Sequence, residues 1–178
     1  MSRLAPLMSS ERGDWRTPEV VLDLVRRVAP IGLDPCTSID NPVGAMAYAI
    51  PVVRMVMPPG CLVDGLSDAW TWRGACPEGA LVYANPPYGR EVGDWTERCR
   101  VEGQRGAEVI ALLPARTDTR WFHRDVAPPA AQALCLWAGR LTFIGGEAGA
   151  PFPSLLAYYG PRRHRFAAVF CDAGAIWT

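Results

Sequence analysis

The four residues Asn85-Pro86-Pro87-Tyr88 combine side chains that could take part in catalysis. They follow an apolar run, residues 81–84, that is typical of a buried strand. Two consecutive prolines end such a strand, because neither has an amide hydrogen to donate, and they fix the backbone where they stand. The sequence therefore predicts a rigid corner that carries an amide side chain beside an aromatic ring.

This corner suits the activation of a planar aromatic amine. The exocyclic amine of adenine is a poor nucleophile, because its lone pair is delocalised into the ring. The Asn85 side-chain oxygen and the Pro86 carbonyl could accept hydrogen bonds from its two N–H groups and so draw the lone pair back to nitrogen. The rigidity of the prolines would keep both acceptors preorganised. Tyr88 could stack on a base taken out of its helix. An electrophile that is already activated, such as a sulfonium methyl group, would then need no strong general base.

Polar residues also follow two earlier apolar runs. Asp34-Pro35 follows residues 31–33, and Asp64-Gly65 follows residues 61–63. Ligands of parallel α/β sheets bind at the carboxyl ends of the strands, so Asp34, Asp64 and Asn85 are expected to converge on one rim. Asp-Pro and Asp-Gly are also ordinary turn sequences, and for either aspartate taken alone the turn is the more frequent role.

The apolar runs predict an α/β fold in a single domain, residues 1–178, of which residues 1–13 are expected to be flexible. Runs that are apolar on both faces favour a mainly parallel sheet covered by helices, and the later strands are expected to form an antiparallel hairpin at one edge. A helix is expected to open with Thr17 as its N-cap and Pro18 at its first position, and residues 92–103 are expected to form a crossover helix. The expected strands are residues 31–33, 45–50, 61–63, 81–84, 109–113, 133–137, 155–159 and 166–171.

Composition excludes several classes of protein. The chain is 49% hydrophobic and 20% charged with no net charge, which is typical of a globular protein that is not drawn to nucleic acid as a polycation would be. No apolar run approaches the roughly 18 residues that span a membrane, and the start lacks the apolar core of a signal peptide, so a cytoplasmic location is expected. Six cysteines that stand singly and two histidines argue against a metal site or a disulfide scaffold, and buried free thiols are expected instead.

Seven stretches in order resemble the phage-type DNA N-6-adenine-methyltransferase family, whose members are S-adenosylmethionine-dependent amino-methyltransferases. The Asn-Pro-Pro-Tyr corner is the most informative of them. They cover most of the chain and read DWRTPEVVLDLV, LDPCTSIDN, VDGLSDAW, VYANPPYG, LLPARTDTRWF, GRLTF and PFPSLLAYY.

The resemblance implies a Rossmann-like class I methyltransferase fold, S-adenosylmethionine as cofactor, DNA as partner and a phage or prophage origin. It implies that the corner Asn85, Pro86, Pro87 and Tyr88 is catalytic. The cofactor residues that it implies are Thr17 and Pro18 beside the methionine end, Asp34 and Pro35 at the end of the first strand, and Asp64 and Gly65 at the adenine. The DNA contacts that it implies are Arg116, Arg120, Trp121, Arg140 and Phe143.

The sequence departs from the family pattern in two places and leaves alternatives open. Cys36-Thr37-Ser38 replaces the glycine-rich loop common after the first strand, and Ile50-Pro51 stands where a ribose-binding acid is expected. No insertion is large enough for a separate target-recognition domain. We therefore expect the DNA sequence to be recognised by loops or by a partner subunit, or to be recognised with little selectivity. The same corner occurs in methyltransferases of protein glutamine side chains and of guanine amines in ribosomal RNA. A degenerate relative that binds nucleic acid without methyl transfer is a further alternative.

Overall fold

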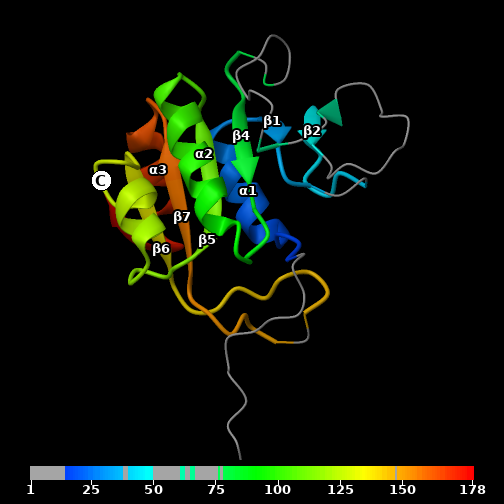
Figure 1. Cartoon of the computed structure of the whole chain (residues 1–178). Helices are drawn as coiled ribbons and strands as arrows, with labels where there is room; N and C mark the ends of the chain where they lie inside the picture. The colour runs from blue at the N-terminus through cyan, green and yellow to red at the C-terminus, as the bar shows by residue number, and fades with distance from the viewer. Residues whose placement is uncertain are drawn as a thin grey trace, which may run out of the picture.

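The computed structural model describes residues 15–37, 40–49, 61, 62, 65, 66, 76, 78–146 and 148–178. The expectations for residues 1–13 and for Asp64 therefore lie outside the described residues. The described strands form one mixed sheet of eight strands in the order β3-β2-β1-β4-β5-β7-β6-β8. An α/β fold is thus confirmed, with helices on both faces of the sheet (Figure 1).

One half of the sheet is parallel. It contains β1 (Ile31–Asp34), β2 (Ala47–Ala49), β3 (Cys61–Leu62), β4 (Leu81–Ala84) and β5 (Val109–Pro114). Every residue of β1, β4 and β5 is buried, because helices cover both faces, and this explains why these strands show continuous apolar runs without alternation. The predicted positions of these strands hold to within a few residues.

The other half is antiparallel. Strand β7 (Ser154–Tyr159) pairs antiparallel with both β5 and β6 (Ala133–Trp137), and β8 (Gly174–Trp177) pairs antiparallel with β6. The predicted antiparallel pair is present in β6 and β7. It does not form the edge, however, since β8 lies outside it.

The prediction of a strand at residues 166–171 is wrong. These residues belong mostly to helix α3 (Arg163–Phe170), in which Phe166 and Phe170 lie one turn apart and are fully buried. Their rings contact each other at a centroid distance of 4.6 Å, and Phe166 also stacks on Tyr158. A short apolar run does not distinguish helix from strand, and here the spacing of four between the two phenylalanines carried the helical signal.

Two helical layers cover the sheet. Helix α1 (Glu19–Val28) and α3 contact each other on one face, and α2 (Val92–Gln104) and the π-helix η1 (Phe122–Val126) contact each other on the opposite face. The predicted crossover helix is confirmed as α2. The N-cap of α1 is Pro18 rather than Thr17, because the Thr17 hydroxyl bonds to Tyr83 instead of capping the helix.

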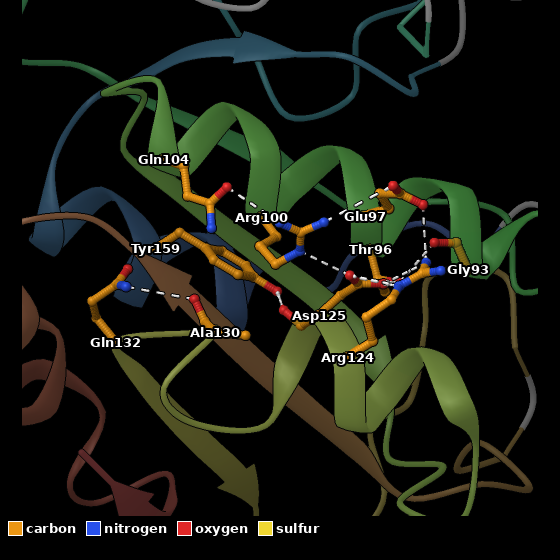
Figure 2. Close-up of polar contacts among 10 residues, drawn as sticks. All are labelled: Gly93, Thr96, Glu97, Arg100, Gln104, Arg124, Asp125, Ala130, Gln132 and Tyr159. Carbon is orange, nitrogen blue, oxygen red and sulfur yellow. Dashed lines mark hydrogen bonds and ion pairs between the residues drawn. The ribbon is translucent and has the colours of Figure 1, made fainter.

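A buried carboxylate holds η1 against α2. Asp125 is fully buried and accepts hydrogen bonds from Arg100 Nε at 2.9 Å, from Arg124 and from the Thr96 hydroxyl (Figure 2). Arg124 also pairs with Glu97 of α2 at 3.0 Å. Two of the arginine charges in this region are therefore neutralised within the protein.

Two further expectations concern helices and thiols. In the part of the chain that the structure describes, no helix is both long enough and apolar enough to span a membrane. The structure shows free thiols at Cys36, Cys76, Cys99, Cys135 and Cys171. Cys99 and Cys135 are buried as expected, whereas Cys171 is exposed, because it directly follows the last turn of α3 at the surface.

Candidate active site at the carboxyl edge of the parallel strands

The Asn-Pro-Pro-Tyr corner and the residues after β1 lie at adjacent strand ends. Strands β1 and β4 pair in parallel with Leu33 opposite Val82, so the chain leaves both strands at the same edge of the sheet. The backbone amide of Asn85 is also close to the Cys36 thiol. Burial raises the pKa of that thiol well above its usual value, and the Asn85 amide acts in the opposite direction. Asp34 and Asn85 therefore share a rim, as predicted.

The orientation of the Asn85 amide follows from its neighbours. Its nitrogen Nδ2 donates to the backbone carbonyl of Trp15 and to the Thr17 hydroxyl, the latter at 3.1 Å. A carbonyl oxygen can only accept, so the atom that faces Trp15 must be the amide nitrogen. Both amide hydrogens are used in this way. The oxygen Oδ1 is buried and has no hydrogen-bond partner among the described residues.

Thr17 connects this amide to a second buried hydroxyl. Thr17 Oγ1 lies 2.8 Å from the Tyr83 hydroxyl, and Tyr83 is fully buried on β4. Burial raises the pKa of Tyr83 well above its usual value, so the phenol stays protonated at neutral pH. Tyr83 is not among the residues predicted from the sequence. The available signal was its position two residues before Asn85, which places both side chains on the same side of the chain.

Tyr88 turns toward the core at the end of the corner. Its hydroxyl donates to the carbonyl of Leu112 on β5 at 3.2 Å, and the residue is 9% exposed. Phe143 and Phe152 meet its ring edge-on with centroids 6.2 and 5.3 Å away. Trp15 contacts the same two phenylalanines at 5.2 and 5.7 Å. We call Trp15, Tyr88, Phe143 and Phe152 the aromatic cluster.

The connection between β6 and β7, residues 138–153, supplies half of the aromatic cluster. This segment lies beyond the arrowhead of β4, drawn in yellow to orange in Figure 1. It is joined to the segment before α1 by a bridge between Arg16 and Ile144, in which the Ile144 amide donates to the Arg16 carbonyl at 3.0 Å. Phe143 thus lies buried beside the corner, while Arg140 of the same segment is exposed. Phe152, which was not singled out in the sequence, lies between Pro151 and Pro153.

Asp34 is a buried acid at the end of β1. It is 4% exposed, and burial raises its pKa to about 6, against the opposing effect of hydrogen bonds that include the Cys36 amide at 3.1 Å. The next residue, Pro35, contacts the turn at Gly65 so closely that a Cβ atom at Gly65 would lie 1.7 Å from the Pro35 carbonyl oxygen. The structure therefore brings together Asp34, Pro35 and Gly65, three of the predicted cofactor residues.

The predicted DNA residues that follow β5 lie in different environments. Arg116 is partly buried, and its Nε atom has no hydrogen-bond partner among the described residues. Arg120 is exposed. Trp121 packs against Gly93 at the start of α2 and against Phe122, and so belongs to the face of the sheet opposite the aromatic cluster.

Unpartnered buried polar atoms accumulate at this edge of the sheet. Besides Asn85 Oδ1 and Arg116 Nε, they include the indole nitrogen of Trp15 and the hydroxyl of Ser154, which stands opposite Pro114 at the end of β5. Native proteins leave few buried polar atoms unpaired, so these atoms are free to bind water or a ligand at this edge. Among the described residues, no group of three or more His, Cys, Asp or Glu side chains could hold a metal ion.

Comparison with known families adds to this geometry. The sequence model of the family described as DNA N-6-adenine-methyltransferase (Dam) matches residues 5–154. The chain belongs to this family. The matched region contains the corner and the whole aromatic cluster, and it ends at Ser154, the first residue of β7. No curated protein and no solved structure matches the chain significantly.

Proposed function

We propose that the protein is a DNA methyltransferase that transfers a methyl group from S-adenosylmethionine to the N6 amine of adenine. Membership in the Dam family supports a methyltransferase with DNA as its substrate. The observation that supports the chemistry most directly is the Asn85 amide, whose nitrogen is fully engaged and whose oxygen has no partner among the described residues. An acceptor held in this way is what an exocyclic amine requires.

In this proposal Asn85 Oδ1 and the Pro86 carbonyl each accept a hydrogen bond from one N–H group of the adenine amine. The two prolines hold both acceptors in place before the base arrives, so that no reorganisation is needed during the reaction. An unpaired buried acceptor costs roughly 1–3 kcal/mol, and the bond to the amine removes this cost when the base binds. S-adenosylmethionine, when bound, supplies a methyl group on a positively charged sulfonium.

Tyr88 would provide the surface on which the flipped base stacks, a contact worth roughly 1–3 kcal/mol. In the structure Tyr88 is 9% exposed, and Phe143 and Phe152 form edge-to-face contacts with its ring. Because so little of Tyr88 is exposed, a base that stacks on it would require neighbouring side chains to move. Because residues 138–153 carry both phenylalanines, we propose that this connection shifts when the base enters.

The cofactor would lie across the ends of β1 and β4. We propose Thr17, Pro18, Asp34, Pro35, Asp64 and Gly65 as its contacts. Asp34 fits this role because a buried carboxylate with a raised pKa gains from a nearby positive charge, which S-adenosylmethionine carries. Gly65 fits because only glycine permits the close approach to Pro35. The parallel strands, the crossover helix α2 and the antiparallel β7 support assignment of the sheet to the Rossmann-like class I methyltransferase fold.

DNA would contact the same edge of the sheet. We propose Arg116, Arg120, Trp121, Arg140 and Phe143 as DNA or target-base contacts, in a cytoplasmic enzyme of phage or prophage origin. The exposed Arg120 and Arg140 are suited to bind phosphates, whereas the buried Phe143 is suited to the base.

The test is mass spectrometry of nucleosides from plasmid DNA, made in a host without adenine methylation that expresses one of three variants. The wild type is expected to produce N6-methyladenine. Asn85→Ala is expected to lower turnover roughly 10²–10³-fold, the scale for losing one preorganised polar partner. Gln104→Ala is the matched control, because it removes an exposed carboxamide at the far end of α2, and it is expected to behave as the wild type.

Binding of S-adenosylmethionine, measured by calorimetry, separates the alternatives. A wild-type protein that binds the cofactor but leaves plasmid DNA unmethylated would redirect the search to RNA or protein substrates. A protein that neither binds the cofactor nor methylates DNA would be a degenerate relative. Wild-type turnover in Asn85→Ala would contradict the mechanism proposed for the corner.

A further inference from the structure

We propose that Tyr83 and Thr17 are positioning residues that hold the Asn85 amide with its oxygen toward the target amine. The inference deepens the proposed function and rests on it, because it concerns the acceptor that the reaction needs. Neither residue would touch the base in this role. They would act through the hydrogen bonds of Asn85.

The side chains of Tyr83, Thr17 and Asn85 form a chain of hydrogen bonds, which we call the relay. The Tyr83 and Thr17 hydroxyl oxygens lie 2.8 Å apart, and Asn85 Nδ2 lies 3.1 Å from the Thr17 oxygen. Tyr83 is fully buried and Thr17 is 5% exposed, so water does not readily replace either partner. The relay begins on β4, crosses to the segment before α1 and returns to the end of β4 at the corner.

The direction of the Thr17 hydroxyl proton determines which atom of the Asn85 amide faces Thr17. A threonine hydroxyl has one hydrogen and two acceptor sites. Asn85 Nδ2 donates to one acceptor site, which requires that the Thr17 proton point elsewhere. The Tyr83 oxygen can accept that proton. Either hydroxyl can be the donor of this bond, and with Thr17 as the donor its lone pair stays turned toward Asn85.

Without the Tyr83 hydroxyl, the Thr17 proton is free to turn toward Asn85. A donor in that position favours the flipped amide, in which Oδ1 faces Thr17 and Nδ2 faces the target. The flipped amide would present N–H groups to an amine that itself needs acceptors. The carbonyl of Trp15 still opposes the flip, because in the flipped amide this carbonyl would face Oδ1. Loss of the Tyr83 hydroxyl is therefore expected to weaken the preference for the observed amide orientation without abolishing it.

The kinetic test compares Tyr83→Phe with Tyr159→Phe. Tyr159 is also a buried tyrosine of the sheet, and its hydroxyl donates to the carbonyl of Asp125, within η1, at 2.9 Å (Figure 2). Both variants lose one buried hydrogen bond and are expected to lose similar stability. Only Tyr83→Phe is expected to lower kcat, by roughly tenfold, which is the scale of one hydrogen bond, with KM for DNA unchanged.

Thr17 provides a rescue experiment. Thr17→Val removes the hydroxyl while keeping the shape of the side chain, and is expected to lower kcat at least as much as Tyr83→Phe. Thr17→Ser retains the hydroxyl and is expected to restore most of that loss. Equal activity of the valine and serine variants would contradict the proposed role of the hydroxyl.

A second readout does not depend on methyl transfer. The side-chain NH₂ signals of Asn85 in ¹⁵N-labelled protein, assigned by their loss in Asn85→Ala, are expected to show slow hydrogen exchange in the wild type and in Tyr159→Phe. Faster exchange is expected in Tyr83→Phe. Unchanged exchange and unchanged kcat in Tyr83→Phe would overturn the inference. A wild-type protein inactive on DNA would instead contradict the proposed function, while the exchange measurement would still test the relay.

Discussion

The ring of Phe152 meets the ring of Tyr88 edge-on, with centroids 5.3 Å apart. Phe152 lies two residues before the start of β7, whereas Tyr88 ends the corner after β4. This contact therefore joins the antiparallel half of the sheet to the parallel half. The same phenylalanine ring touches Trp15, which carries the carbonyl that orients Asn85. The packing of Phe152 and the orientation of the Asn85 amide are thus coupled through Trp15.

Phe152→Leu is expected to lower kcat while leaving the fold intact, because a leucine fills much of the space without providing a flat edge against Tyr88. The loss of unfolding free energy is expected to be about 1–2 kcal/mol, measured by urea denaturation. Phe166→Leu in α3 is the control, since Phe166 is fully buried far along the chain from the corner and its loss changes stability alone. A similar fall in kcat in both variants would show that general destabilisation, rather than the contact with Tyr88, is responsible.

The raised pKa of Asp34 predicts a dependence of stability on pH. The folded-state pKa of about 6 exceeds the ordinary value of 3.8, so the folded protein binds more protons than the unfolded chain between these values, and stability falls as pH rises through this interval. Asp34→Asn is expected to remove this slope and to raise the free energy of unfolding above pH 6 by up to roughly 3 kcal/mol. Urea denaturation from pH 4 to 7.5 measures it, with the exposed Asp172→Asn as control.

Binding of S-adenosylmethionine is expected to show the opposite trend with pH. The positively charged cofactor should bind more tightly once Asp34 is ionised, so its Kd should fall as pH rises from 5 to 7. Calorimetry with the wild type and Asp34→Asn measures this trend. A pH dependence that persists in the asparagine variant would assign the effect to another group.

Gly65→Ala is expected to abolish cofactor binding, because the new Cβ atom would lie 1.7 Å from the Pro35 carbonyl oxygen and would force the turn away from the end of β1. Gly93→Ala is the matched control. Its Cβ atom would lie 3.6 Å from Trp121 Cβ, an ordinary contact, and alanine is the better helix former within α2. Retention of the wild-type Kd by Gly65→Ala would remove this turn from the proposed cofactor site.

The two arginines on either side of Trp121 and Phe122 are expected to differ in their contribution to DNA binding. Arg120 is exposed and forms no ion pair with a described residue, whereas Arg124 is paired with Asp125 and Glu97. Arg120→Ala should weaken DNA binding and reduce the salt slope of log K by about 1, as for loss of one phosphate contact. Fluorescence anisotropy over a range of salt concentrations measures this slope. An equal change in Arg124→Ala would show that ion pairing does not determine which arginine binds DNA.

The sequence predicted the parallel strands and the corner well, because two-sided burial gives continuous apolar runs and consecutive prolines have few compatible structures. Asp34 and Asn85 were placed on one rim by the general property that parallel strands end at the same edge. The strand prediction failed at residues 166–171, where six consecutive apolar residues masked the spacing of four between Phe166 and Phe170.

Other features depended on contacts between distant segments. Nothing near Tyr83 in the sequence indicates that its hydroxyl meets Thr17, since the two residues are 66 positions apart. The position of Phe152 against Tyr88 likewise depends on how the long connection after β6 folds back. The role of the Thr17 side chain was assigned to the helix cap because a cap is a local interaction, and the bond to Tyr83 is not.

The bridge between Arg16 and Ile144 has a consequence for how the molecule is made on the ribosome. The parallel strands can associate while the chain is still being synthesised, but Tyr88 remains uncovered until the connection after β6 has emerged and closed against Trp15. A nascent chain would thus acquire its parallel strands before it acquires its aromatic cluster.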